Sequence, residues 1–386
     1  MTLQRVEGNG YFAKNRKKNP IYQDESACQL DLLVACDDIE MGGGDFKSVL
    51  LHNPINSYIF RNRRPTKTIL FWQSLAKIVR NPDTMTKPLA QPYKVVTSNR
   101  CLLGEGPVWD SQRQVIYWLD ILNGIIHEHS PSKNSHRQIP LNDMVGAVAL
   151  CKNGDFIAAM KSGLAIVEQD SGAVKPLVDP ESHLPGNRFN EGKCDPAGRF
   201  WAGSMALSEV EGAGNLYMLD TDGTCSLKIP GVSISNGLAW ASDHKTMYYI
   251  DSPTRKVVAY DYSQATGGIS NQRVAISIPE EEGSPDGMTI DSEGMLWIGH
   301  WDGWQVARWN PLTGQKLLSI GMPAARITSC TFGGETLQDL YITSARVGLT
   351  DEQLEEQPLA GSLFVVENCG FKGMEAVKFG YSEASL

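Results

Sequence analysis

Short apolar runs recur along the chain at a nearly constant interval, with polar turn residues between them. Each unit holds a short apolar strand, a turn and then a strand rich in aromatic residues. The second strands read VIYWLDI, RFWAGSM, KTMYYIDS and MLWIGHW, and the turns before them read DSQRQ, DPAGR, ASDHK and DSEG. Few windows show the 3.6-residue periodicity of a helix, so the pattern indicates an all-β chain.

The units repeat six times. They begin near residues 104, 145, 190, 235, 285 and 327, at intervals of about 41 to 50 residues. The second and sixth units read VGAVALCKNGDFIAAM and ITSCTFGGETLQDLYITSA. A period of roughly 40–50 residues filled by short strands is typical of a β-propeller. The sequence therefore predicts a six-bladed β-propeller with four-stranded blades around a central channel.

Four of the six units place a polar residue at the same point of the first strand. The segments are GEGPVWD, NEGKCD, SNGLAW and PDGMTID, and the polar residues are Glu105, Asn190, Asn236 and Asp286. A glycine follows each within two positions. An aspartate follows five positions later in all but the SNGLAW unit, which has Ala241 there. Because the first strand of each propeller blade lines the channel, we expect these four side chains to converge.

Convergence of two carboxylates and two amide oxygens predicts a site for a divalent cation. Glu105 and Asp286 would repel each other in a buried channel unless one held a proton or a cation lay between them. Asn190 and Asn236 offer neutral oxygen ligands. All-oxygen ligation suits Ca²⁺, Mg²⁺ or Mn²⁺, and Zn²⁺ also accepts carboxylates. The alternative is that these residues cap strands or hold channel water.

Composition narrows the class of protein. The 386 residues are 41% hydrophobic and 20% charged, which is enough to bury a large core. A net charge of −9 argues against nucleic acid or an anionic membrane as a partner. The eight cysteines contain no C-x-x-C pair, and no secretory signal is evident, so we predict reduced thiols in a cytoplasmic protein. The apolar run at 69–79 is too short and too polar to span a bilayer.

The first 84 residues differ from the rest. They carry 12 basic and 9 acidic residues, whereas residues 85–386 carry 23 and 35. Segments such as NRKKNP and FRNRRPTK lack the blade repeat and are typical of irregular basic loops. We expect an irregular extension over 1–84 and the propeller over 85–386. The extension could be a docking arm, or Met85 could be the natural start of the protein.

Several long motifs resemble one known family. The strings LLGEGPVWD, NRFNEGKCDPAGRFWAGSM, SNGLAWASDHKTMYYIDS and PDGMTIDSEGMLWIG are similar to those of the regucalcin, gluconolactonase and luciferin-regenerating-enzyme family, and the resemblance covers about residues 95–380. The family consists of six-bladed propellers with one catalytic divalent metal, many of them sugar-lactone hydrolases. The resemblance implies that Glu105, Asn236 and Asp286 bind the metal, and that Arg188 and Asn190 contact substrate.

The mechanism implied by this resemblance is metal-dependent opening of a sugar lactone. The cation would polarise the lactone carbonyl, and Asp286 would take a proton from the attacking water. Relatives active on aldonolactones hold the sugar with an acidic residue shortly after the RFWAGSM-type strand. That position falls at Ser208 here, with Glu209 beside it. We therefore predict Glu209 as a further substrate-binding residue, or else a different sugar preference.

Two other functions are compatible with the predicted fold. A divalent-cation (calcium) binding regulatory protein would need the same ligands without turnover, and a protein-interaction platform would need no polar convergence in the channel. A non-sugar ester or a phosphoester is also compatible with the motifs. No G-x-S-x-G motif points to a serine nucleophile. His300, in the strand MLWIGHW, is expected to pack within its blade rather than bind a ligand.

Overall fold

The computed structural model describes residues 93–380 continuously and four strands before them; residues 1, 6–32, 36–46, 53–56, 63–92 and 381–386 lie outside the described part. The chain divides into two compact units, Met1–Pro88 and Leu89–Leu386. The first unit holds a sheet of order β1-β4-β3-β2, formed by β1 (Thr2–Arg5), β2 (Leu33–Ala35), β3 (Lys47–His52) and β4 (Ser57–Asn62). The basic segment 15–20, most of 60–67, the apolar run 69–79 and Met85 fall outside the described residues.

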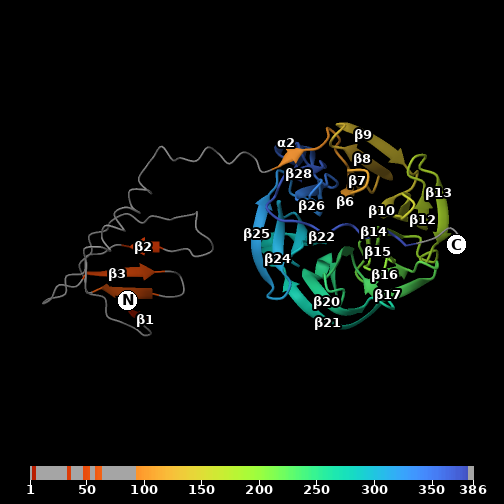
Figure 1. Ribbon diagram of the computed structural model, residues 1–386. Helices are drawn as coiled ribbons and strands as arrows, with labels where there is room; N and C mark the ends of the chain where they lie inside the picture. The colour runs from red at the N-terminus through yellow and green to blue at the C-terminus, as the bar shows by residue number, and fades with distance from the viewer. Residues whose placement is uncertain (1, 6–32, 36–46, 53–56, 63–92, 381–386) are drawn as a thin grey trace. The chain divides into compact units, whose positions relative to one another are not determined.

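The second unit is a six-bladed β-propeller, as the repeat predicts (Figure 1). Each blade is a four-stranded antiparallel sheet. The innermost strands are β6 (Gly104–Asp110), β10 (Val145–Leu150), β14 (Asn187–Cys194), β18 (Ser235–Trp240), β22 (Ser284–Ile290) and β26 (Ile327–Gly333). Each packs against the innermost strand of the next blade, and β26 packs against β6, which closes the ring.

The second and third strands of each blade form its middle. The second strands are β7 (Val115–Asp120), β11 (Phe156–Met160), β15 (Phe200–Ala206), β19 (Thr246–Asp251), β23 (Leu296–Trp301) and β27 (Asp339–Ser344). The third strands are β8 (Ile125–Ser130), β12 (Gly163–Val167), β16 (Gly214–Leu219), β20 (Lys256–Ser263), β24 (Gln305–Asn310) and β28 (Phe364–Val366). Most of these residues are buried, because both faces of the sheet meet a neighbouring blade.

The outermost strands meet solvent. They are β9 (Ser135–Pro140), β13 (Val174–Val178), β17 (Cys225–Val232), β21 (Gly268–Ser277), β25 (Gln315–Gly321) and β5 (Lys94–Val95). In β25 exposed and half-buried positions alternate with the two-residue period of a strand that has one wet face. Within residues 93–380 the helical segments are short: η2 (Ser252–Thr254), η3 (Glu280–Glu282) and α2 (Asp351–Glu356).

Two distant parts of the chain close the ring. β5 pairs with β28, so the sixth blade takes its outer strand from the start of the propeller and its other strands from the end. The chain after β28 then crosses the ring (Figure 1). Gly373 donates to the Leu337 carbonyl on one side, and Phe379 and Gly380 donate to Leu150 and Gly198 on the other.

The aspartate five positions after the polar residue has a structural role. The Asp291 carboxylate accepts from the Glu293 and Met295 amides across the turn, from Trp297 Nε1 at 2.9 Å and from Arg308 Nε at 2.7 Å. Asp195 makes the equivalent bonds to Trp201 and Arg199 in the third blade. In these two blades the aspartate joins the inner strand to the next strand, and Asp110 of the first blade accepts from the Gln112 and Arg113 amides of its turn, which accounts for the recurrence of the residue without any role in the channel.

Candidate functional site

The four predicted polar residues lie at equivalent positions near the N-terminal ends of β6, β14, β18 and β22. All are buried, with exposed fractions of 4% for Glu105, 6% for Asn190, 3% for Asn236 and 5% for Asp286. The six innermost strands each carry a register shift at this level, for example between Glu105 and Val108 in β6. Such bulges redirect a side chain and are frequent beside functional sites.

The glycines that follow the polar residues permit close packing of the inner strands. A Cβ placed on Gly237 would lie 2.6 Å from Met288 Cγ and 2.9 Å from the Asp286 carbonyl oxygen. A Cβ on Gly287 would lie 2.3 Å from Ser329 Oγ and 3.0 Å from a carboxylate oxygen of Glu191. Glycine is thus required sterically at both positions, and the recurring polar-glycine pair is explained by strand contact as well as by chemistry.

Asn236 presents a carbonyl oxygen that no described residue satisfies. Its Nδ2 donates to Ser252 Oγ at 2.8 Å, which fixes the orientation of the amide, whereas the buried Oδ1 has no hydrogen-bond partner. An unpaired buried acceptor is costly, so such an atom in a native fold indicates that a water or an ion binds there. A cation is a suitable partner because the Asn236 side chain interacts with the carboxylate of Asp286.

We call Glu105, Asn190, Asn236 and Asp286 the anchor residues. The two anchor carboxylates, those of Glu105 and Asp286, interact electrostatically. Burial, together with the nearby charges of Asp286 and Glu191, raises the pKa of Glu105 well above its usual range. Burial and Glu191 do the same to the pKa of Asp286. The Gly106 amide donates to Glu105 at 3.0 Å and Arg188 is near both carboxylates, but these effects offset only part of the shift. A divalent cation between the carboxylates would offset the electrostatic cost of burying two like charges, so the residues present fit a metal.

Glu191 and Lys193, which were not among the predicted site residues, add charges to this region. Burial raises the pKa of Glu191 and lowers that of Lys193, and the two partly compensate each other. Glu191 accepts from the Gly192 amide at 3.0 Å, and Lys193 Nζ donates to the Met288 carbonyl at 2.6 Å. The segment NEGKCD could have indicated these two residues, because opposite charges within a strand that is predicted to be buried must find partners.

Arg188 and Asn190 form a connected pair on β14. Arg188 donates to Asn190 Oδ1 at 2.6 Å and to the Phe189 carbonyl at 3.0 Å, and Asn190 Nδ2 donates to the Ser235 carbonyl at 2.8 Å. Asn190 Oδ1 is therefore already engaged, unlike the equivalent atom of Asn236. Burial lowers the pKa of Arg188 to about 10, which leaves the guanidinium charged at neutral pH.

Glu209 lies in the turn after β15 and is exposed, with a left-handed backbone conformation of φ 55°. It acts electrostatically on Arg188, together with Glu105 and Asp286. A polar cavity of about 340 Å³ includes Arg188 and is otherwise lined by residues such as Asp143, Lys161 and Glu181. The predicted substrate-binding residues therefore share one electrostatic environment with the two anchor carboxylates.

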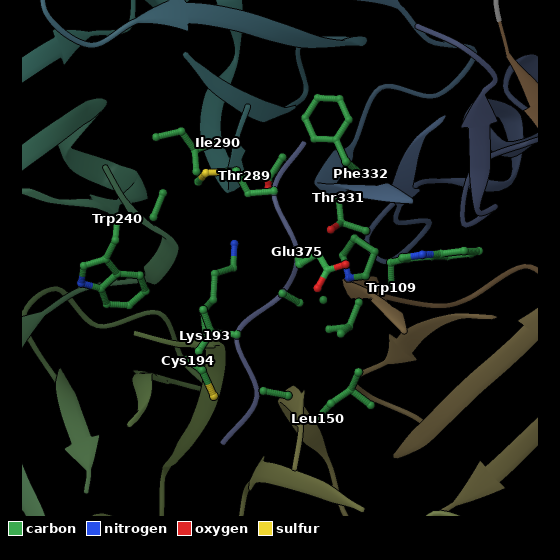
Figure 2. Close-up of a pocket in the computed structure, with 18 of the residues that line it drawn as sticks. Trp109, Leu150, Lys193, Cys194, Trp240, Thr289, Ile290, Thr331, Phe332 and Glu375 are labelled. Atoms are coloured by element: carbon green, nitrogen blue, oxygen red, sulfur yellow. The ribbon is translucent and has the colours of Figure 1, made fainter. Parts of the chain in front are cut away.

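A second cavity, of about 300 Å³, lies at the opposite end of the inner strands (Figure 2). Its walls come from the C-terminal halves of these strands, including Trp109, Leu150, Lys193 and Trp240, and Glu375 of the crossing C-terminal segment reaches into it. The four anchor residues line neither cavity; they lie near the N-terminal ends of the inner strands, whereas this cavity is built from the C-terminal halves.

A separate group of metal-ligating side chains lies in the first blade. Ligand atoms of Cys101, Asp120 and His127 all lie within 4.8 Å of one another, and the three side chains are buried. The sequence analysis did not predict this group. All six cysteines in the described part of the chain are free thiols.

His300 packs within its blade, as expected from the sequence. Its Nδ1 contacts the Glu282 carbonyl at 3.0 Å, and Trp309 Nε1 donates to its Nε2 at 3.3 Å. The imidazole is fully buried and stacks on the Trp309 ring with an interplanar angle of 22°. Both ring nitrogens are thus used within the fifth blade.

Comparison with known proteins agrees with this architecture. Regucalcin of Gallus gallus is 38% identical over 290 residues, which is 74% of this chain and 97% of that protein. A Bacillus subtilis protein, YvrE, named provisionally as a sugar lactone lactonase, is 37% identical over 265 residues, which is 69% of this chain and 91% of that protein. Of solved structures, luciferin-regenerating enzyme aligns with a TM-score of 0.71 and 32% identity, covering 75% of this chain and 99% of that one.

The matched part of the chain spans the site. The family model described as SMP-30/gluconolactonase/LRE-like region matches residues 103–346, a range that contains all of the anchor residues and Arg188. No helix in the described ranges has the length and apolar character needed to cross a membrane. The motifs, the propeller and the matches agree, and this chain belongs to the SMP-30/gluconolactonase/LRE-like family.

Proposed function

We propose that this protein is a metal-dependent hydrolase that opens a sugar (aldono-) lactone to its aldonic acid. The observation that carries the proposal is the unsatisfied Oδ1 of Asn236 beside the two buried carboxylates of Glu105 and Asp286. These three side chains would hold one divalent cation, which supplies Lewis acidity to a carbonyl oxygen. The naming of related proteins as lactonases supports the substrate class.

Asp286 is the proposed general base. Coordination of a cation lowers the pKa of a carboxylate, which weakens it as a base. In this site, burial and the Glu191 charge act in the opposite direction on the pKa of Asp286. A base whose pKa lies nearer neutrality accepts a proton from water more readily, so Glu191 would help Asp286 retain basicity. Water would then add to the carbonyl carbon as Asp286 takes its proton, the ring C–O bond would break, and the proton would pass to the leaving ring oxygen to give a hydroxyl.

Arg188 and Asn190 are the proposed substrate-binding residues. The Arg188 Nη1 donors are directed to Asn190 and the Phe189 carbonyl, which holds the guanidinium plane rigid within the site. A planar, charged fork suits the adjacent oxygens of a polyhydroxylated ring. Glu209, exposed and within electrostatic reach of Arg188, would accept hydroxyl hydrogen bonds at the entrance.

A pH-indicator assay on a panel of five- and six-membered sugar lactones tests the proposal. It compares metal-loaded protein, chelated protein and Asp286→Ala, with spontaneous hydrolysis subtracted. Asp261→Ala is the matched control, because Asp261 is an exposed carboxylate on the outer part of the fourth blade. Metal-dependent acid release that disappears only in Asp286→Ala is the expected result.

A second candidate function uses the same ligands without turnover. Regucalcins are among the most similar relatives, and one related structure, from Agrobacterium tumefaciens, is described as a calcium-binding protein. If the protein binds a cation tightly but hydrolyses no lactone of the panel above background, the lactonase proposal is wrong. The site would then be a cation-binding one with a regulatory role.

A further inference from the structure

We propose that Cys101, Asp120 and His127 form a second metal site, selective for a thiophilic ion such as Zn²⁺, which fastens the first blade of the propeller to the segment that precedes it. This site is independent of the oxygen-only ligand set of the proposed lactonase centre. It does not depend on the proposed function.

The distances suit a tetrahedral ion. Cys101 Sγ lies 3.6 Å from His127 Nε2. Two ligands of one tetrahedral zinc, at a Zn–S distance of about 2.3 Å and a Zn–N distance of about 2.05 Å, stand about 3.6 Å apart. An Asp120 oxygen lies within 4.8 Å of the Cys101 sulfur and of a ring nitrogen of His127. Thiolate, imidazole and carboxylate together favour zinc over calcium or magnesium, which prefer oxygen ligands alone.

His127 is oriented as a metal ligand. Its Nδ1 lies 3.1 Å from His136 Nε2, and the rings of Trp118, His127 and His136 stack with interplanar angles of 11° to 23°. When His127 Nδ1 donates to His136, the Nε2 lone pair faces the Cys101 sulfur. Metal-binding histidines characteristically donate their second ring N–H in this way. Burial also lowers the pKa of His127 to about 4, so the ring is neutral at pH 7.

Asp120 retains one acceptor position. Its carboxylate takes hydrogen bonds from the Leu102 and Leu103 amides at 2.9 and 3.2 Å and from Asn123 Nδ2 at 2.8 Å. A carboxylate offers about four lone pairs, so one position, on Oδ1, stays available. Asp120 can thus bind an ion without losing its hydrogen bonds from the Leu102 and Leu103 amides.

Cys101 requires a cation to ionise. Burial raises the pKa of its thiol to about 12, so the thiol is protonated in the absence of metal. The buried Trp118 Nε1 makes no hydrogen bond of ordinary geometry with any described residue, yet its interaction with Cys101 favours the thiolate. Metal binding would release the thiol proton to solvent, as at other zinc–thiolate sites. A catalytic role for Cys101 is excluded because its side chain is 1% exposed.

The position of the ligands gives the ion a structural role. Cys101 lies on the connection from β5, in the sixth blade, to β6, in the first, and its amide donates to the Gly361 carbonyl at 2.7 Å. Asp120 ends β7 and His127 lies on β8. An ion at this point would therefore join the closing segment of the ring to two strands of the first blade.

Cobalt spectroscopy tests the site on the full-length protein. Metal is removed with a strong chelator, Ca²⁺ is added in excess to occupy an oxygen-only site, and Co²⁺ is titrated in. We expect a thiolate-to-cobalt charge-transfer band that saturates at one ion per chain and is displaced by Zn²⁺. The band should be lost in Cys101→Ser and His127→Gln. It should persist in Cys151→Ser, which alters another fully buried thiol.

Thermal unfolding supplies a second readout. Zn²⁺ should raise the Tm of the wild-type protein and of Cys151→Ser but not that of Cys101→Ser, because an ion that binds only the native state stabilises it. A wild-type protein with no charge-transfer band, or a band of equal intensity in Cys101→Ser, would overturn the proposal. A wild-type protein without the band overturns the proposal even if a variant fails to fold, and His127→Gln tests the assignment if Cys101→Ser is unstable.

Discussion

Asn236 and Ser252 are joined by a hydrogen bond of 2.8 Å from the amide nitrogen to the hydroxyl, and this bond directs the Asn236 carbonyl oxygen away from every described partner. Ser252 in turn donates to the Pro285 carbonyl at 2.6 Å, next to Asp286 in the chain. One hydroxyl thus connects two of the three proposed metal ligands. Orientation of a ligand by such a partner is a general feature of metal sites.

We therefore predict that Ser252→Ala lowers the affinity for a divalent cation by about tenfold or more, the usual effect of removing a group that orients a ligand. Isothermal titration calorimetry with Ca²⁺ and Mn²⁺ measures the change. Ser277→Ala, at an exposed position at the end of β21, should leave the affinity unchanged. Equal affinities of Ser252→Ala and the wild-type protein would show that Asn236 is not a ligand oriented in this way.

A second prediction concerns Arg188. Lysine keeps the charge but cannot reproduce the donor fork that reaches Asn190 and the Phe189 carbonyl. A lost hydrogen bond to a charged group is worth about 1.5–3 kcal/mol, so Arg188→Lys should lower kcat/KM for a lactone by roughly 10- to 100-fold. Steady-state kinetics should show the same cation affinity as the wild-type protein. Arg273→Lys, in an exposed ion pair, is the control, and unchanged kinetics in Arg188→Lys would remove this residue from the substrate site.

The sequence predicts the blades well because their determinants are local. In the first, third and fifth blades, the inner strand leads into a turn whose aspartate binds turn amides and, in the third and fifth blades, also the tryptophan of the next strand. All the residues that form such a turn lie within about ten positions of one another, so the turn appears in the sequence as a repeated motif. The four anchor residues recur at the same interval because they occupy equivalent positions on their inner strands.

The parts that the sequence did not predict depend on pairing between distant segments. Cys101 lies before the first repeat, and only the register that sets Gly104 opposite Asp120 and Trp118 opposite His127 brings the three ligands together. No spacing motif signals this group. Glu191 and Lys193 lie in β14, which reads NRFNEGKC, so two more charges do not stand out among its polar residues, and the Met288 carbonyl that accepts from Lys193 belongs to another blade.

A third prediction tests the structural role of the repeated aspartate. Asp291 is buried, with Arg308 Nε at 2.7 Å and Trp297 Nε1 at 2.9 Å. Asp291→Ala leaves Arg308 Nε and the Trp297 indole N–H without their acceptor, while Arg308 Nη2 keeps Glu293 at 2.6 Å. Breaking a buried ion pair by removing one partner costs about 3–5 kcal/mol. Urea unfolding should show a loss of this order. Asp261→Ala breaks an exposed pair with Arg273 and should cost at most about 1 kcal/mol. Similar losses in the two variants would contradict the assignment.

The last prediction concerns the pH dependence of stability. Burial lowers the pKa of His300 to about 4, compared with about 6.5 for an exposed histidine. The native protein therefore holds His300 neutral while the unfolded chain binds a proton there. The stabilisation is complete above pH 6.5 and is lost as the pH falls towards 4, by up to about 3 kcal/mol. Protonation of Nε2 would also remove the acceptor of the Trp309 indole N–H.

His300→Gln removes this titration but keeps groups that can accept from Trp309 and donate to the Glu282 carbonyl. The free energy of unfolding is measured with urea at intervals from pH 7.5 to pH 4.5 for both proteins. We expect a smaller decrease for the variant than for the wild-type protein, since other buried histidines, including His127, still contribute to the remaining slope. His244→Gln, which alters a histidine on an exposed turn, should follow the wild-type curve. If His300→Gln and the wild-type protein lose stability in parallel, His300 is not held neutral by its burial in the fifth blade.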